Sequence, residues 1–189
     1  MAEEKNVEFL INAHQKLVTY NDRIKLLIVG DGPDKEKYEK LSESLGMSQN
    51  IIFNGKAAWE EIPLYYHSAN LFATASTTET QGLTVIEAMA SNVPPLCIED
   101  DSFKGTVTDE LNGRFFKTDD EYTSQVINFF ESKDEIESYA KQARVQAEHC
   151  SSRNYAERVL EVYERAIKEK NKEEKYGIIS KIINLFKGE

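Results

Sequence analysis

Residues Glu79 to Glu87 read Glu-Thr-Gln-Gly-Leu-Thr-Val-Ile-Glu, and the chain continues with Ala-Met-Ala-Ser-Asn-Val-Pro-Pro. Two carboxylates therefore lie eight positions apart, with Gly82 between them. The apolar spacing that follows predicts a helix up to residue 91, with one face formed by Leu83, Ile86 and Ala90. Glu79 then lies in a loop before the helix, Gly82 marks the junction, and Glu87 follows about one turn into the helix.

This arrangement suits a phosphate group with hydroxyls on either side of it. A helix N-terminus carries free N–H groups and the positive end of the helix dipole. Gly82 has no side chain, so a ligand can approach the backbone closely there. Carboxylates before and after the junction could each hold hydroxyl groups. A sugar and a ribose that flank a diphosphate fit this pattern.

Strand and helix signals alternate along the rest of the chain. Short apolar runs predict strands at 24–29, 50–54, 70–75, 94–98 and 113–117. Amphipathic or capped stretches predict helices at 6–20, 33–45, 59–67, 82–91, 119–130, 133–148 and 151–170. The βα spacing predicts an α/β fold with a Rossmann-like parallel sheet sandwiched by helices. Ligands bind at the carboxyl ends of such strands, so the loops after Val29, Asn54 and Ala75 are the expected rim of the site.

The Glu79–Glu87 stretch resembles the E-x7-E motif of the family-4 retaining glycosyltransferases, whose fold is called GT-B. Four further segments, in the right order, are similar to family patterns, and the likeness extends over roughly residues 3 to 170. These segments are Glu4–Ile11, Ile28–Pro33, Ser68–Ser76 and Pro94–Cys97. The resemblance implies the carboxyl-terminal, donor-binding half of a GT-B enzyme.

The other half of a GT-B enzyme, which holds the acceptor, has no counterpart in this sequence. We expect an excised domain rather than a naturally truncated protein, with the N-terminal acceptor domain as its missing partner. The family's partner arginine for phosphate binding also has no match here. The expected division is a nucleotide-sugar binding domain at residues 1–172, followed by an amphipathic helix at 173–189.

The resemblance also implies roles for individual residues. Glu79 is the expected catalytic residue, which positions the donor sugar and acts electrostatically. Lys5 matches the lysine that neutralises the leaving phosphate, and Glu87 would hold the two ribose hydroxyls. The remaining expected donor-binding residues are Gly30, Gly32, Gly55, Lys56, Gln81, Gly82 and Leu83. No cofactor and no metal are required in this scheme, and the substrate is a nucleotide-sugar, expected to be a UDP-hexose.

Composition limits the possible partners. The formal net charge of −10 argues against nucleic-acid binding, which needs a basic surface. Neither the three histidines nor the two cysteines, Cys97 and Cys150, have metal-ligand spacing, so we expect two reduced thiols. No apolar run approaches the length of a membrane span.

The C-terminal tail differs from the rest of the chain in charge. Residues 165–189 hold seven Lys or Arg and four Glu. One helical stripe there would carry Tyr176, Ile179, Ile183 and Phe186. Such a helix either packs on the N-terminal domain or lies at a membrane surface. We therefore expect a cytoplasmic protein, with peripheral contact at the inner face of the membrane as one option.

The sequence thus predicts the donor-binding domain of a retaining glycosyltransferase that moves a hexose, with glucose favoured, to a lipid or polysaccharide. By itself the domain should be inactive. Two alternatives stay open: a non-catalytic glycosyltransferase-like partner subunit, and a UDP-sugar epimerase of GT-B fold. A response-regulator-like interaction domain is disfavoured because no acidic phospho-acceptor cluster follows the first strand.

Overall fold

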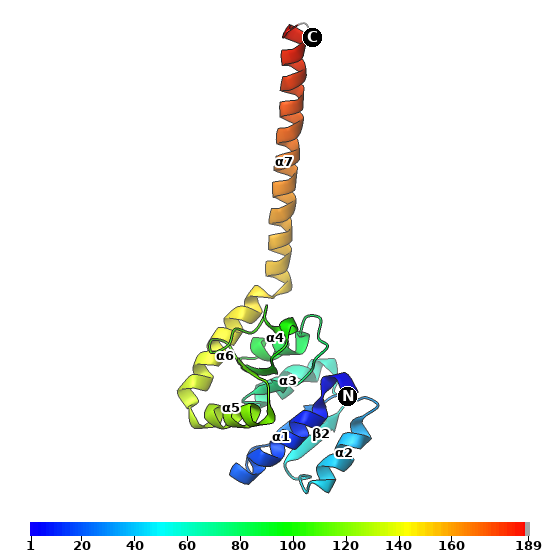
Figure 1. Ribbon diagram of the computed structural model, residues 1–189, viewed down its shortest axis with the longest axis vertical. Coiled ribbons are helices and arrows are strands. Elements are labelled where there is room, and N and C mark those ends of the chain that lie inside the picture. Colours follow the sequence, from blue (N-terminus) through cyan, green and yellow to red (C-terminus); the bar gives the residue numbers. More distant parts are fainter. Residues whose placement is uncertain (188–189) are drawn as a thin grey trace. The chain divides into compact units, whose positions relative to one another are not determined.

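The computed structural model describes the backbone of residues 1–187 and the side chains of residues 1–172. Helices and strands alternate along the chain (Figure 1). The strands are β1 (Leu26–Val29), β2 (Ile51–Gly55), β3 (Phe72–Thr74), β4 (Pro95–Ile98) and β5 (Arg114–Phe116). The α-helices are α1 (Val7–Tyr20), α2 (Lys35–Ser44), α3 (Ile62–Ser68), α4 (Leu83–Ala90), α5 (Asp119–Glu131), α6 (Lys133–His149) and α7 (Ser152–Lys187). Three 3-10 turns complete the list: η1 (Glu3–Lys5), η2 (Trp59–Glu61) and η3 (Asp101–Phe103).

The predicted elements are all present, with two notable differences in length. The strand expected at 70–75 is reduced to the three residues of β3. The helix expected to end at residue 170 continues as α7 to Lys187, because no proline interrupts it and Lys and Glu, which favour helices, occupy every position from 168 to 175 except Asn171.

The backbone forms two compact units, Met1–Glu148 and His149–Glu189. The first unit holds all five strands, and the second contains α7. The predicted boundary at residue 172 lies within α7, and the division into a binding domain and a tail stays a prediction. The apolar stripe expected at Tyr176, Ile179, Ile183 and Phe186 lies outside the residues whose side chains are described.

All strands are parallel, as predicted, but they form two ladders. Strand β1 pairs with β2, and β4 lies between β3 and β5. Between residues 1 and 187 no ladder joins β1 to β3. Residues of β1 and β3 nevertheless pack against the same core cluster and line one cavity. The expected α/β, Rossmann-like class is confirmed.

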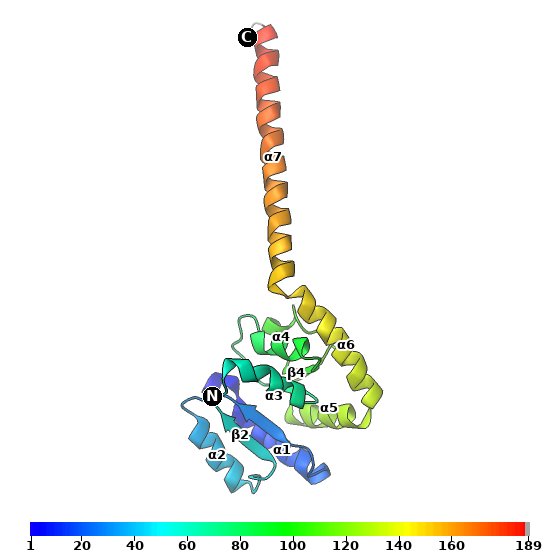
Figure 2. The same ribbon diagram turned by 180° about the vertical axis from the view of Figure 1, so that it is seen from behind.

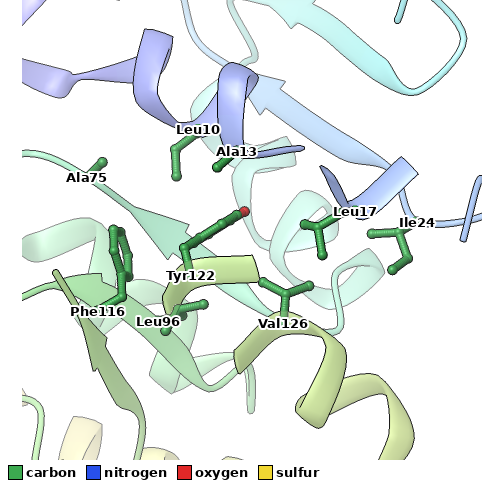
Figure 3. Close-up of a cluster of buried hydrophobic side chains, with 9 residues drawn as sticks. All are labelled: Leu10, Ala13, Leu17, Ile24, Ala75, Leu96, Phe116, Tyr122 and Val126. Carbon is green, nitrogen blue, oxygen red and sulfur yellow. The ribbon is translucent and has the colours of Figure 1, made fainter. Parts of the chain in front are cut away.

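Helix α1 links two parts of the core. Its residues Leu10, Ala13 and Leu17 pack toward Tyr122 and Val126 of α5, as Figure 3 shows. The Phe116 ring packs edge-on against Tyr122, with ring centroids 5.2 Å apart. On another side, α1 contributes to a cluster with α2 and β2 that contains Val7, Ile11, Tyr38, Met47 and Ile51. Burial on both sides fixes α1 and the turn η1 that precedes it.

Helix α4 buries one side of its short apolar sequence. Its fully buried residues are Val85, Ala88 and Met89. Val85 and Met89 pack in one cluster with residues of β4 and α6, and α4 and α6 lie side by side in both views (Figures 1 and 2). Leu83 is 60% exposed. Nearly all the residues of this short helix are apolar, so the sequence alone does not mark the buried side. The structure thereby leaves Leu83 at the edge of the cavity.

The buried His14 of α1 predicts a stability that depends on pH. Its side chain is 1% exposed, and burial lowers its pKa from 6.5 to about 4. Above pH 6.5 the imidazole is neutral in both the folded and unfolded chains. Between pH 6.5 and 4 the unfolded chain binds a proton that the folded chain excludes. The free energy of unfolding should therefore fall by about 3 kcal/mol across this range as pH decreases.

Urea unfolding at pH 7 and pH 5 measures this effect. His14→Phe, which does not titrate, should lose part of the stability difference between the two pH values, whereas His67→Gln on the exposed face of α3 should keep it. An equal pH dependence in His14→Phe and the unmodified chain would show that other groups cause it.

Candidate functional site

A cavity of about 590 Å³ runs along β1 and β3 and includes the loops that follow their carboxyl ends. Four segments far apart in sequence form its walls: the N-terminal residues, the end of β1, strand β3 and the loop that leads into α4. The residues that line it are Met1, Lys5, Val7, Leu10, Leu26 to Gly30, Phe72 to Thr74 and Glu79 to Leu83 with Thr84. The cavity thus occupies the place where a doubly wound α/β fold binds ligands.

The glycine loop after β1 forms one edge of this cavity. Gly30 adopts φ +132° and donates its N–H to the carbonyl of Gly55 at 2.8 Å. Gly55, at the end of β2, has φ +73°, a conformation that favours glycine. Of the four residues predicted here, only Gly30 lines the cavity. Gly32, Gly55 and the exposed Lys56 belong to the same or the neighbouring loop but are not among the described lining residues.

Lys5 and Glu79, both predicted site residues, form an ion pair inside the cavity. Their Nζ and Oε1 atoms are 2.6 Å apart, and the side chains are 46% and 17% exposed. The turn η1, which carries Lys5, is held to the segment after β3. The buried Ser76 donates its hydroxyl to the Glu4 carbonyl at 3.4 Å, and the Thr77 N–H donates to the same oxygen at 3.3 Å.

The Lys5 ammonium keeps Glu79 ionised. Its hydrogen bond is the largest influence and lowers the pKa of Glu79 below the ordinary range. Burial acts in the opposite direction, and the Ser76 hydroxyl assists Lys5. Glu79 is therefore a carboxylate at neutral pH, and the cavity contains a positive and a negative side chain in contact.

The N-terminus of α4 forms another part of the cavity wall. Gly82 is the N-cap with φ +57°, and no side chain caps this end. The first N–H groups of a helix have no intrahelical partner, so backbone donors remain at Gly82, Leu83 and Thr84. A Cβ at Gly82 would lie 3.1 Å from Cε1 of Phe103. The positive φ is also unfavourable for residues with a side chain, so this position needs glycine. Gln81, another predicted residue, also lines the cavity.

Glu87, the second carboxylate of the motif, has a different environment. Among the residues whose side chains are described, it is not part of the cavity lining. It lies half-buried on α4, where its Oε2 accepts a hydrogen bond of 3.0 Å from the Tyr66 hydroxyl of α3. The expectation that an acid within this apolar helix needs a partner is confirmed, but the partner is a tyrosine that the sequence did not single out.

The structure thus brings together Lys5, Glu79, Gln81, Gly82, Leu83 and Gly30, and places Glu87, Gly32, Gly55 and Lys56 off the cavity lining. Sequence reasoning missed three residues: Ser76, which secures η1, Thr84, which adds a backbone donor, and Tyr66. Ser76 lies in the strand segment quoted above and could have been found there. Thr84 follows directly from a helix start at Gly82.

The described part of the chain holds neither a metal cluster nor a membrane span. Among the side chains of residues 1–172, no three His, Cys, Asp or Glu come together as a metal site. No helix within residues 1–187 is both long and apolar enough to cross a membrane.

A protein-family model described as Glycosyl transferases group 1 matches residues 1–146. The chain belongs to this family. The alpha-monoglucosyldiacylglycerol synthase of Acholeplasma laidlawii is 33% identical over 172 residues, which are 91% of this chain and 43% of that protein. The enzyme of the same name from Streptococcus pneumoniae is 27% identical over 164 residues, which are 87% of this chain and 37% of that protein. This group 1 chain therefore spans about two fifths of the length of these curated relatives.

A solved structure shows the same fold. S. aureus TarM, crystallised as a variant in complex with fondaparinux, alpha-GlcNAc-glycerol and UDP, matches with a TM-score of 0.79. The match covers 86% of this group 1 chain and 34% of that chain, at 22% sequence identity. The predicted GT-B architecture is therefore confirmed at the level of fold.

Proposed function

We propose that this chain is the donor-binding domain of a retaining family-4 glycosyltransferase. It moves a hexose, with glucose favoured, from a UDP-linked donor to a lipid or polysaccharide acceptor held by the rest of a longer protein. By itself the domain binds the donor weakly and transfers little.

The observation that supports this proposal most strongly is the pairing of two features in one cavity. Lys5 and Glu79 form an ion pair there, and the uncapped N-terminus of α4 forms another part of the wall. A diphosphate needs backbone N–H groups and a cation, both of which this cavity offers. A sugar hydroxyl needs an acceptor such as the Glu79 carboxylate.

Each site residue then takes one role. Gly82 and Leu83, with Gln81 beside them, receive the diphosphate, and Lys5 neutralises the charge that develops on it as the sugar leaves. Glu79 holds the sugar hydroxyls, and its negative charge stabilises the positive charge that grows on the sugar ring. Lys5 and the α4 amides stabilise the negative charge of the leaving diphosphate, with no metal required.

The remaining residues serve the nucleoside end of the donor. Glu87 accepts the ribose hydroxyls, and the loops with Gly30, Gly32, Gly55 and Lys56 lie toward the base. The choice of UDP and of a lipid acceptor draws on the names of the relatives, two of which are glucosyldiacylglycerol synthases, and on the UDP bound to TarM.

Calorimetric titration tests donor binding and nucleotide choice. The unmodified chain should bind UDP with a dissociation constant on the order of 0.1 to 1 mM, and GDP and ADP more weakly. Glu87→Ala should weaken UDP binding. If none of these nucleotides binds at millimolar concentration while the circular dichroism spectrum is that of a folded protein, the donor-site proposal is wrong.

Assays of the longer protein that contains this domain distinguish the proposed function from the two alternatives, a non-catalytic partner subunit and an epimerase. A non-catalytic partner subunit would not release sugar from UDP-glucose, and an epimerase would convert the donor into its epimer. The proposal expects transfer or slow hydrolysis of UDP-glucose that Glu79→Ala abolishes. Turnover unaffected by Glu79→Ala would count against the proposed role of this residue.

We further propose a cytoplasmic location in which the segment after residue 172 contacts the inner face of the membrane. The basic charge of residues 165–189 and their apolar periodicity support this placement. The full chain should float with vesicles that contain about 30% anionic lipid, and a chain that ends at residue 172 should float several-fold less. Equal flotation of the two forms would contradict a membrane role for this segment.

A further inference from the structure

The Tyr66–Glu87 pair joins α3 to α4 near the motif but outside the cavity lining. The Tyr66 hydroxyl donates to Oε2 of Glu87 at 3.0 Å. The Tyr66 ring also packs edge-on against Phe72, with centroids 5.8 Å apart and planes inclined by 61°. Phe72 is part of β3 and lines the cavity. Tyr66 is therefore held by its ring against the cavity wall and by its hydroxyl against the carboxylate.

The direction of this hydrogen bond is fixed. Burial and the neighbouring Glu87 charge both raise the pKa of Tyr66 above its usual value. The phenol thus stays protonated and donates, while Glu87 accepts. Only one carboxylate oxygen takes part, and no other side chain of residues 1–172 forms a hydrogen bond or ion pair with this group. The second oxygen remains available to a hydroxyl donor.

We propose that Tyr66 is a positioning residue, whose hydroxyl holds the Glu87 carboxylate in one orientation so that it can accept the ribose hydroxyls of the donor. This inference rests on the ribose role assigned to Glu87 in the proposed function. A glutamate side chain has three rotatable bonds, and a bound ligand must otherwise bear the cost of ordering them. The tyrosine reduces that cost before the nucleotide arrives.

Affinities for UDP and 2′-deoxy-UDP test the proposal in the full chain. The unmodified chain should prefer UDP by about tenfold or more, as expected for a hydrogen bond to a charged group. Tyr66→Phe keeps the ring contact with Phe72 and removes only the hydroxyl. It should reduce the preference for UDP by about three- to tenfold, with a smaller effect on 2′-deoxy-UDP. Glu87→Gln should also reduce the preference, and combining it with Tyr66→Phe should cause little further loss.

Tyr65→Phe is the matched control, because it removes a tyrosine hydroxyl from the same helix α3 without touching Glu87. It should retain the preference for UDP. Thermal melting of each variant shows whether a weaker preference for UDP comes from loss of the fold or from loss of the Glu87 orientation. If Tyr66→Phe does not stay folded, Tyr66→His replaces it under the same criterion, because its shorter ring cannot place a donor at the phenol position.

The outcomes separate this inference from the proposed function. Preference retained in Tyr66→Phe but reduced in Glu87→Gln would overturn the positioning role and leave Glu87 as a ribose ligand. Preference retained in both variants would overturn the ribose role as well, while UDP binding itself would still support a donor site. Failure of the unmodified chain to bind UDP would overturn the inference together with the proposed function.

Discussion

Replacing Lys5 with glutamine should weaken UDP binding by about 10- to 100-fold. Lys5 carries the one cationic side chain within the described cavity lining, and hydrogen bonds between a charged donor and a phosphate are worth about 1.5–3 kcal/mol. Glutamine keeps much of the side-chain length but removes the charge. Calorimetric titration at constant ionic strength measures the change, since the interaction is screened by salt.

Lys40→Gln provides the matched control for Lys5→Gln. Lys40 also forms an ion pair of 2.6 Å, with Glu36, but it lies exposed on α2 away from the cavity lining. Its replacement should leave the UDP affinity unchanged within about twofold, because a surface pair contributes little. Equal losses in the two variants would mean that Lys5 acts through the general charge of the protein rather than at the diphosphate.

Replacing Glu79 with glutamine should separate binding from catalysis. The change removes a negative charge that competes with the diphosphate for Lys5, so UDP should bind equally well or a few-fold more tightly. Transfer from UDP-glucose by the longer protein should nevertheless fall by about 10²- to 10³-fold, the size of effect seen when one stabilising group is removed from a transition state. Steady-state kinetics and UDP titration together measure this split.

Glu8→Gln is the corresponding control for Glu79→Gln. Glu8 pairs with Lys37 at 2.7 Å, outside the described cavity lining, and its replacement should change neither quantity. The proposed role of Glu79 would be contradicted if Glu79→Gln weakened UDP binding and transfer by the same factor. Equal losses would mean that Glu79 only binds the nucleotide or only maintains the fold.

The location of the site could be predicted from local sequence. A glycine between a polar loop and an apolar run marks the start of α4, and Gly82 is indeed its N-cap. The βα alternation predicts parallel strands, so the loop before α4 had to lie near the loop after Val29. Gly30 and Gly82 accordingly line one cavity. These conclusions depend on short-range patterns and on the common geometry of parallel sheets.

The partners within the site could not be predicted in the same way. Lys5 and Glu79 are 74 residues apart, and their contact depends on how η1 is held against the segment after β3. Glu87 and Tyr66 belong to different helices, and nothing in either local pattern indicates the hydrogen bond between them. Side-chain pairs of this kind follow from the packing of whole elements, which the sequence specifies only through the complete core.

The buried face of α4 shows a second limit of sequence reasoning. Apolar residues occupy nearly every position from Leu83 to Ala90, so several faces have similar hydrophobicity. Contacts with Cys97, Phe103 and α6 select the face with Val85 and Met89. The same absence of a local signal explains the misplaced end of α7, where a polar stretch at 168–175 is helical rather than a boundary.

A crystal structure of the chain with UDP would show whether the start of α4 is the diphosphate site. We expect the diphosphate at the N-terminus of α4, close to the backbone N–H groups of Gly82 and Leu83. Lys5 Nζ should then have moved from Glu79 toward a phosphate oxygen, which would leave Glu79 free to face the donor sugar. UDP bound elsewhere, with the Lys5–Glu79 ion pair unchanged and no phosphate at α4, would contradict the account.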